Sequence, residues 1–157
     1  YTENLTLKAG VNLTAFDCDS SLNATGHVII SGTCTMTTAG TVTISGIQLQ
    51  TNSANLLAVT GSEISNVSLV NCYLNCTNNT GISFTSSNAA SNIRIYNCTG
   101  NLGTTGITYF VNTSVGAIII SNSDLENGGS SLTASTSSAG IVIVQESRFI
   151  APITTTS

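Results

Sequence analysis

A repeat of about 25 residues runs through this sequence and constrains its fold more than any other feature. Valine or isoleucine opens a short apolar run at five positions, and the gaps between them are 25, 26, 25 and 24 residues. The runs are VTISGIQL, VSLVNCYL, IRIYNCTG, IIISNSDL and VIVQESRF, which begin at Val42, Val67, Ile93, Ile118 and Val142. A repeat of this length is typical of units that bury their apolar faces by stacking on one another. The period therefore predicts a solenoid.

The fifth position of each run is occupied by a residue suited to a sharp bend. It is Gly46, Asn71, Asn97, Asn122 and Glu146 in the successive repeats. Glycine and asparagine enter the left-handed region of backbone conformation more readily than other residues do. We therefore expect a bend between two short strands here, with the asparagine amides hydrogen-bonded along the stack.

Alternation of apolar and polar residues on both sides of the bend predicts which side chains face inward. A third alternating run follows a polar turn in each repeat. Three strands per coil at this period predict an all-β fold, a single-stranded right-handed parallel β-helix. The expected inward pairs in the repeat from Val67 are Val67 and Leu69, Cys72 and Leu74, and Ile82 and Phe84.

The composition is polar but almost uncharged. Only 6% of the 157 residues are charged, against about 25% in ordinary domains. With three lysines and arginines and a net charge of −4, the chain lacks the basic patch that nucleic-acid binding requires. No apolar run is long enough for a membrane span, so we expect no membrane insertion.

We expect one β-helix domain over residues 1–157, as a fragment of a longer chain. The polar stretch 17–26 predicts a surface loop inserted between coils. The threonine-rich tail from Ala151 predicts the start of a further coil.

The five cysteines and single histidine do not form a metal-ligand pattern, and no cofactor or metal is expected. Cys72 and Cys98 fall in one inward register of adjacent coils. Two interpretations remain open, a stack of small apolar thiols or a disulfide between neighbouring strands.

The segment Asn92 to Thr99, NIRIYNCT, resembles the repeat of the pectate-lyase-like β-helix superfamily. The opening YTENLTLKAGV is similar to the first coil of pectinesterases and of many phage tail proteins. Among the members of that superfamily, the low charge and the Ser/Thr/Asn-rich coils are most like viral and bacteriophage tail fibre or tailspike domains. The resemblance implies a fold strongly and a function only by analogy.

Enzymes of that superfamily cluster acids and bases beside the third strand and the turn after it. Glu63 is the only carboxylate in those turns here, so we predict no catalytic residues. Asp124 and Arg148 share one outward register, with Glu126 close by. They indicate either a carboxylate pair with an arginine that binds a sugar, or an exposed salt-bridge ladder.

Outward aromatic residues suggest a glycan contact, because aromatic faces stack on sugar rings. Tyr73 and Tyr96 are expected to face outward, with Arg94 beside Tyr96. Ile119 and Ile143 also face outward in one register, which favours a contact surface between chains, such as a homotrimer interface.

These features predict a structural β-helix domain of a virion or phage tail fibre or spike, which contacts a host surface glycan or receptor. One alternative is an adhesin at a cell surface. A second is a fragment of a polysaccharide lyase or hydrolase. A third, ice binding by hydroxyl rows on the third strand, is disfavoured because Ala58 and Phe110 interrupt the rows.

Overall fold

The computed structural model describes residues 1–15, 28–52, 54–61, 64–78, 80–86, 91–104, 106–111, 116–126, 132–136, 141–149 and 153–156. These residues form short strands and no helix. Within the same ranges, the chain has no helix long and apolar enough to cross a membrane. The stretch predicted as a surface loop, 17–26, lies outside them.

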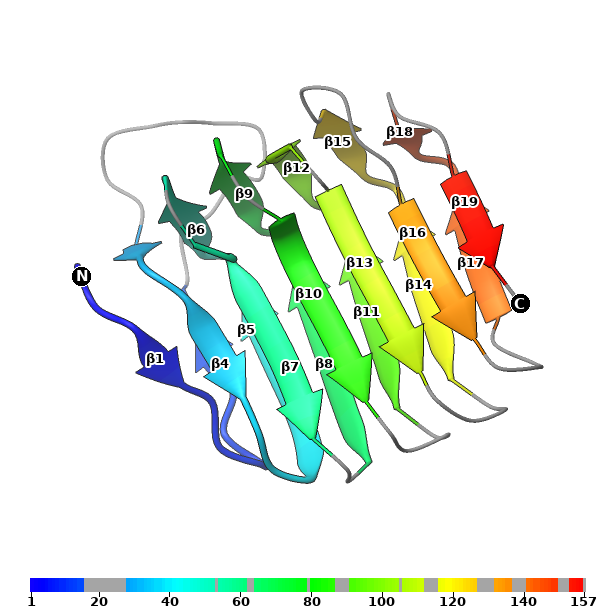
Figure 1. Cartoon of the computed structure of the whole chain (residues 1–157). Helices are drawn as coiled ribbons and strands as arrows, with labels where there is room; N and C mark the ends of the chain where they lie inside the picture. The colour runs from blue at the N-terminus through cyan, green and yellow to red at the C-terminus, as the bar shows by residue number, and fades with distance from the viewer. Residues whose placement is uncertain are drawn as a thin grey trace.

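The strands belong to three sheets in which every strand pair is parallel, and each coil contributes one strand to each sheet (Figure 1). The first sheet contains β1 (Leu5–Thr6), β4 (Cys34–Met36), β7 (Leu57–Gly61), β10 (Thr80–Ser86), β13 (Gly106–Val111), β16 (Leu132–Thr136) and β19 (Ile153–Thr156). The second contains β2 (Leu13–Thr14), β5 (Gly40–Ser45), β8 (Ser65–Val70), β11 (Asn92–Tyr96), β14 (Ala117–Ser121) and β17 (Ile141–Gln145). The third contains β3 (Ile29–Ser31), β6 (Gln48–Thr51), β9 (Tyr73–Cys76), β12 (Thr99–Leu102), β15 (Asp124–Glu126) and β18 (Arg148–Phe149).

This arrangement is a parallel β-solenoid with three strands per coil, as the repeat predicts. The register follows the sequence period, since Val42 pairs with Val67 and Ile93 pairs with both Val67 and Ile118. The two ends of the chain lie at opposite ends of the stack (Figure 1). The threonine-rich tail contributes a strand of a further coil, as predicted, because β19 extends the first sheet beyond β16.

The second and third sheets meet at the predicted bend. All five bend residues have positive φ, at 66° for Gly46, 52° for Asn71, 50° for Asn97, 50° for Asn122 and 47° for Glu146. The first four bends are also tied to the next coil by backbone hydrogen bonds. The amides of Gly46, Asn71 and Asn97 donate to the carbonyls of Val70, Tyr96 and Ser121 at 3.0–3.1 Å.

The core is a continuous column of the predicted inward side chains. Residues such as Ile44, Leu69, Ile95 and Ile120 are fully buried and belong to one hydrophobic cluster. Parallel strands stack identical register positions directly above one another, so the cluster continues from coil to coil.

The first coil departs from expectation in two places. Apolar residues that alternate with polar ones are expected to lie on strands and face inward, but Val11 and Val28 precede β2 and β3 and are 49% and 40% exposed. The Val11 amide donates to the Lys8 carbonyl at 3.1 Å, so Val11 completes a turn before the strand begins.

Candidate functional site

The six residues singled out from the sequence divide between two sheets. Arg94 and Tyr96 lie two positions apart on β11 and are both exposed. Tyr73 lies on β9 and is half-buried. Because the bend at Asn71 separates the second sheet from the third, these side chains do not form one aromatic platform.

The third sheet carries an outward row that runs from Gln48 through Tyr73, Thr99 and Asp124 to Arg148. Asp124 and Arg148 are direct register partners at its end. Arg148 Nε and Nη2 donate to the two carboxylate oxygens of Asp124 at 2.7 and 2.9 Å.

This ion pair is solvated, with the Arg148 and Asp124 side chains 59% and 45% exposed. An exposed pair of this kind contributes about 0–1 kcal/mol to stability. Both carboxylate oxygens accept hydrogen bonds from the guanidinium. This geometry matches the exposed salt bridge, which is one of the two interpretations of the sequence. Glu126 pairs in register with Asn101, and the structure describes only its backbone.

The Tyr96 hydroxyl is hydrogen-bonded to one of the bend asparagines, Asn122. The amide of Asn122 donates from Nδ2 to the Tyr96 hydroxyl at 3.4 Å, whereas Asn97 Nδ2 donates to Asn71 Oδ1 at 2.8 Å. The predicted ladder of amides is therefore confirmed between Asn71 and Asn97, and Asn122 uses the tyrosine instead. Tyr96 is held at the surface by this contact and remains 40% exposed.

Buried thiols occupy the positions after two of the bends. Cys34, Cys72 and Cys98 form no disulfide, and these three residues and Cys76 are fully buried. Cys18 lies outside the described residues. The Cys72 and Cys98 thiols each contact the carbonyl two residues before, Val70 O and Tyr96 O, at 3.4 Å. The stack of free thiols is the arrangement present, and not the disulfide.

The same register continues with hydroxyls. Ser123 Oγ accepts from the Cys98 amide at 3.1 Å, and Ser147 Oγ accepts from the Ser123 amide at 3.1 Å. The pKa of the Cys98 thiol is raised well above its ordinary value, because the thiol donates to Cys72 and is buried. Cys72, Cys98 and Ser123 are buried in the core, whereas Ser147 is only partly buried.

The described residues contain no group of three or more His, Cys, Asp or Glu side chains that could hold a metal ion. On the first sheet, Thr85 pairs in register with Thr60 and Phe110, so the hydroxyl row is interrupted where the sequence indicated.

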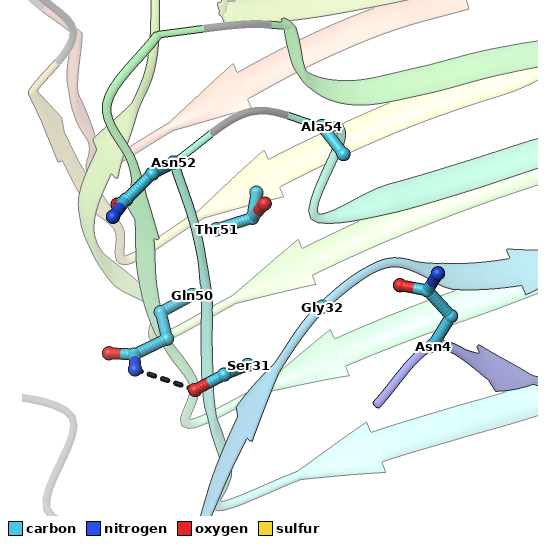
Figure 2. Close-up of a pocket in the computed structure, with 7 residues that line it drawn as sticks. All are labelled: Asn4, Ser31, Gly32, Gln50, Thr51, Asn52 and Ala54. Carbon is cyan, nitrogen blue, oxygen red and sulfur yellow. Dashed lines mark hydrogen bonds between the residues drawn. The ribbon is translucent and has the colours of Figure 1, made fainter. Parts of the chain in front are cut away.

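The sequence patterns did not single out a polar cavity near the N-terminal end of the stack. It lies where strands of the third sheet turn into the first sheet, and its volume is about 450 Å³. Figure 2 shows the residues that line it, which are Asn4, Ser31, Gly32, Gln50, Thr51, Asn52 and Ala54. The signal that could have found it is the unequal length of successive turns.

The fold and these surfaces define the chain as a parallel β-solenoid protein. Comparison of the sequence and structure with protein-family models, curated proteins and solved structures finds no significant match. Functional inference therefore depends on the geometry of the described residues.

Proposed function

We propose that this chain is a structural domain of a virion or phage tail fibre or spike, a stiff rod whose outward face contacts a host surface glycan or receptor. The observation that carries the proposal is the continuous stack of coils. The first sheet runs in register from β1 to β19, and the described part of the hydrophobic core runs from Leu5 to Val144. Such solenoids resist bending because every coil is hydrogen-bonded to the next.

The surface chemistry supports a scaffold or a binding role before an enzymatic one. The carboxylate of Asp124, which was the best candidate for an acid or base, is held by Arg148 through two hydrogen bonds. A carboxylate engaged in this way is not positioned as a free proton donor or nucleophile. The low charge and the Ser/Thr/Asn-rich coils support the viral fibre assignment by analogy with fibre members of the pectate-lyase-like superfamily.

An apolar patch on the second sheet supports assembly into a homotrimer. Ile119 and Ile143 are register partners and half-buried, and Ile141 beside them is 54% exposed. Apolar patches of this kind are typical of contacts between chains.

Two experiments test the proposal. Sedimentation equilibrium should give a trimer for the purified chain, and Ile141→Asp should shift it toward monomer. A monomer at high concentration in the unmodified chain contradicts the fibre assignment.

A polysaccharide-depolymerisation assay should release no reducing ends. Release that is lost in Asp124→Asn would establish an enzyme instead.

A further inference from the structure

The polar cavity arises from the unequal lengths of neighbouring turns. β3 is joined to β4 by residues 32–33, whereas β6 is joined to β7 in the next coil by residues 52–56. A short turn therefore lies beside a longer one, which leaves a recess between them. Figure 2 shows Asn4 on one side of Gly32, and Gln50, Thr51 and Asn52 on the other.

Gly32 allows the N-terminal segment to lie against the short turn. A Cβ atom there would lie 2.3 Å from the Glu3 carbonyl oxygen, so only glycine permits the N-terminal segment to approach this turn. The approach places Asn4 at the cavity, where its Oδ1 accepts from the Thr33 amide at 2.9 Å.

The lining is rich in hydrogen-bonding groups that carry no charge. Gln50 Nε2 donates to Ser31 Oγ at 2.7 Å, and Gln48 Nε2 donates to Gln50 Oε1 at 2.9 Å. Gln48 is only 3% exposed although it belongs to the outward row, so its contact with Gln50 is shielded from solvent. Its Oε1 atom is buried and accepts no hydrogen bond from the described part of the chain.

Two amide donors remain available at the cavity. The Oδ1 atom of Asn52 accepts from Thr77 Oγ1 at 3.3 Å, and that of Asn4 is held by Thr33. Among the hydrogen bonds of the described residues, none uses the Nδ2 atom of Asn4 or Asn52. The cavity thus presents fixed amides with unused N–H groups beside the Ser31 hydroxyl.

We propose that this cavity binds a neutral, hydroxyl-rich ligand, namely a small saccharide. Sugar hydroxyls both donate and accept, and carboxamides and hydroxyls satisfy both roles. A charged ligand would lose hydration here without meeting an opposite charge from the described lining residues, because none of their side chains is ionisable. The volume lies within the range of small-molecule sites, and the polar, open lining predicts a dissociation constant of about 1 mM.

This inference rests on the proposed glycan contact and places it at the turns rather than at Tyr73 and Tyr96. The test is a titration of the isotope-labelled full chain by NMR with galactose, N-acetylglucosamine and galacturonic acid. The neutral sugars should shift the side-chain amide signals of Asn4, Gln50 and Asn52 saturably, and galacturonic acid should bind less tightly.

Asn52→Ala should weaken binding about tenfold, the loss of one hydrogen bond. Ala54→Leu, which fills the cavity without removing a hydrogen-bonding group, should abolish binding. Asn75→Ala is the matched control, because Asn75 is the register partner of Gln50 one coil further on and does not line the cavity. Its affinity should equal that of the unmodified chain, and thermal unfolding should show that all three variants are folded.

Three results would overturn the cavity site. The first is that no side-chain amide signal of Asn4, Gln50 or Asn52 shifts up to about 0.1 M sugar, which is a hundred times the expected dissociation constant. The second is that Ala54→Leu binds the neutral sugars with unchanged affinity. The third is that galacturonic acid binds more tightly than the neutral sugars. Shifts confined to Tyr73 and Tyr96 would also overturn it while leaving the proposed glycan contact intact. Saturable shifts at the cavity in a chain that sediments as a monomer would support the site and contradict only the fibre assembly.

Discussion

Asn97 donates a 2.8 Å hydrogen bond from its side-chain Nδ2 atom to Oδ1 of Asn71 in the preceding coil. Both residues have φ near 50°, the left-handed conformation that turns the chain from the second sheet into the third. One residue type therefore serves two purposes, because asparagine tolerates this backbone and its amide links successive bends.

Replacement of Asn97 by alanine should lower the free energy of unfolding by about 1–2 kcal/mol, from left-handed strain and a lost hydrogen bond. Asn97→Gly should cost less, because glycine adopts this conformation freely and occupies the equivalent position at Gly46. Urea unfolding measures both. A glycine variant less stable than the alanine variant would contradict this explanation of the bend.

Gly100 should tolerate no side chain. A Cβ atom there would lie 1.9 Å from the Leu74 carbonyl oxygen, and the φ angle is 131°. Gly100→Ala should cost about 3 kcal/mol or more, because a strand of the adjacent coil must move.

Gly10→Ala is the matched control for that variant. Gly10 also has positive φ, at 75°, but nothing lies within 4 Å of its Cβ position. Its cost should be limited to the left-handed strain of about 1 kcal/mol. Equal losses of stability in the two variants would show that the close packing of β9 and β12 is not what requires glycine at position 100.

Stability should fall between pH 9 and pH 11 because of Cys34. Burial raises the pKa of this thiol from 9.0 to about 11, with a further contribution from the charge of Cys72. Above pH 9 the unfolded chain releases a proton that the folded chain retains, so unfolding becomes more favourable with rising pH until the folded thiol also ionises.

The full loss from this one group is about 3 kcal/mol. Urea unfolding of the chain and of Cys34→Ala at pH 8 and pH 11 isolates it. The variant should lose less stability over this range, and an equal loss in both proteins would exclude Cys34 as the cause.

The ion pair between Arg148 and Asp124 should matter little for stability. Both side chains are about half exposed, so Arg148→Gln should lower the free energy of unfolding by less than about 1 kcal/mol. The difference should shrink further in high salt. A loss several times larger that salt does not affect would indicate a coupled role for these residues.

The fold could be predicted from the sequence because the period, the bend residue and the alternation all specify the same register. Val67 and Leu69 face inward as the alternation of apolar and polar residues predicted, and Asn71 turns the chain as expected. The first coil was less predictable, since Val11 is apolar but its amide closes a turn on Lys8.

The candidate site was less accessible from sequence. Tyr73 and Tyr96 are both partly accessible at the surface, and the predicted bends already place Tyr73 after Asn71 and Tyr96 before Asn97. The sequence does not reveal that Asn122 contacts the Tyr96 hydroxyl or that Tyr73 is half-buried. The polar cavity depends on the lengths of two turns in neighbouring coils and on Gly32. Neither Gln50 nor Asn52 belongs to a recognisable motif, so only the stacked structure brings them near Asn4.

Stacking of the bends into one column is the claim on which every other inference depends. Hydrogen exchange of the backbone amides of Asn71, Asn97 and Asn122 tests it most directly, because each of these N–H groups donates to a carbonyl of the next coil at 3.0–3.1 Å. We predict that all three exchange slowly, with opening free energies within about 1 kcal/mol of the amides in adjacent strands. Exchange of these three amides at the rate of an unfolded chain would contradict the stacked solenoid.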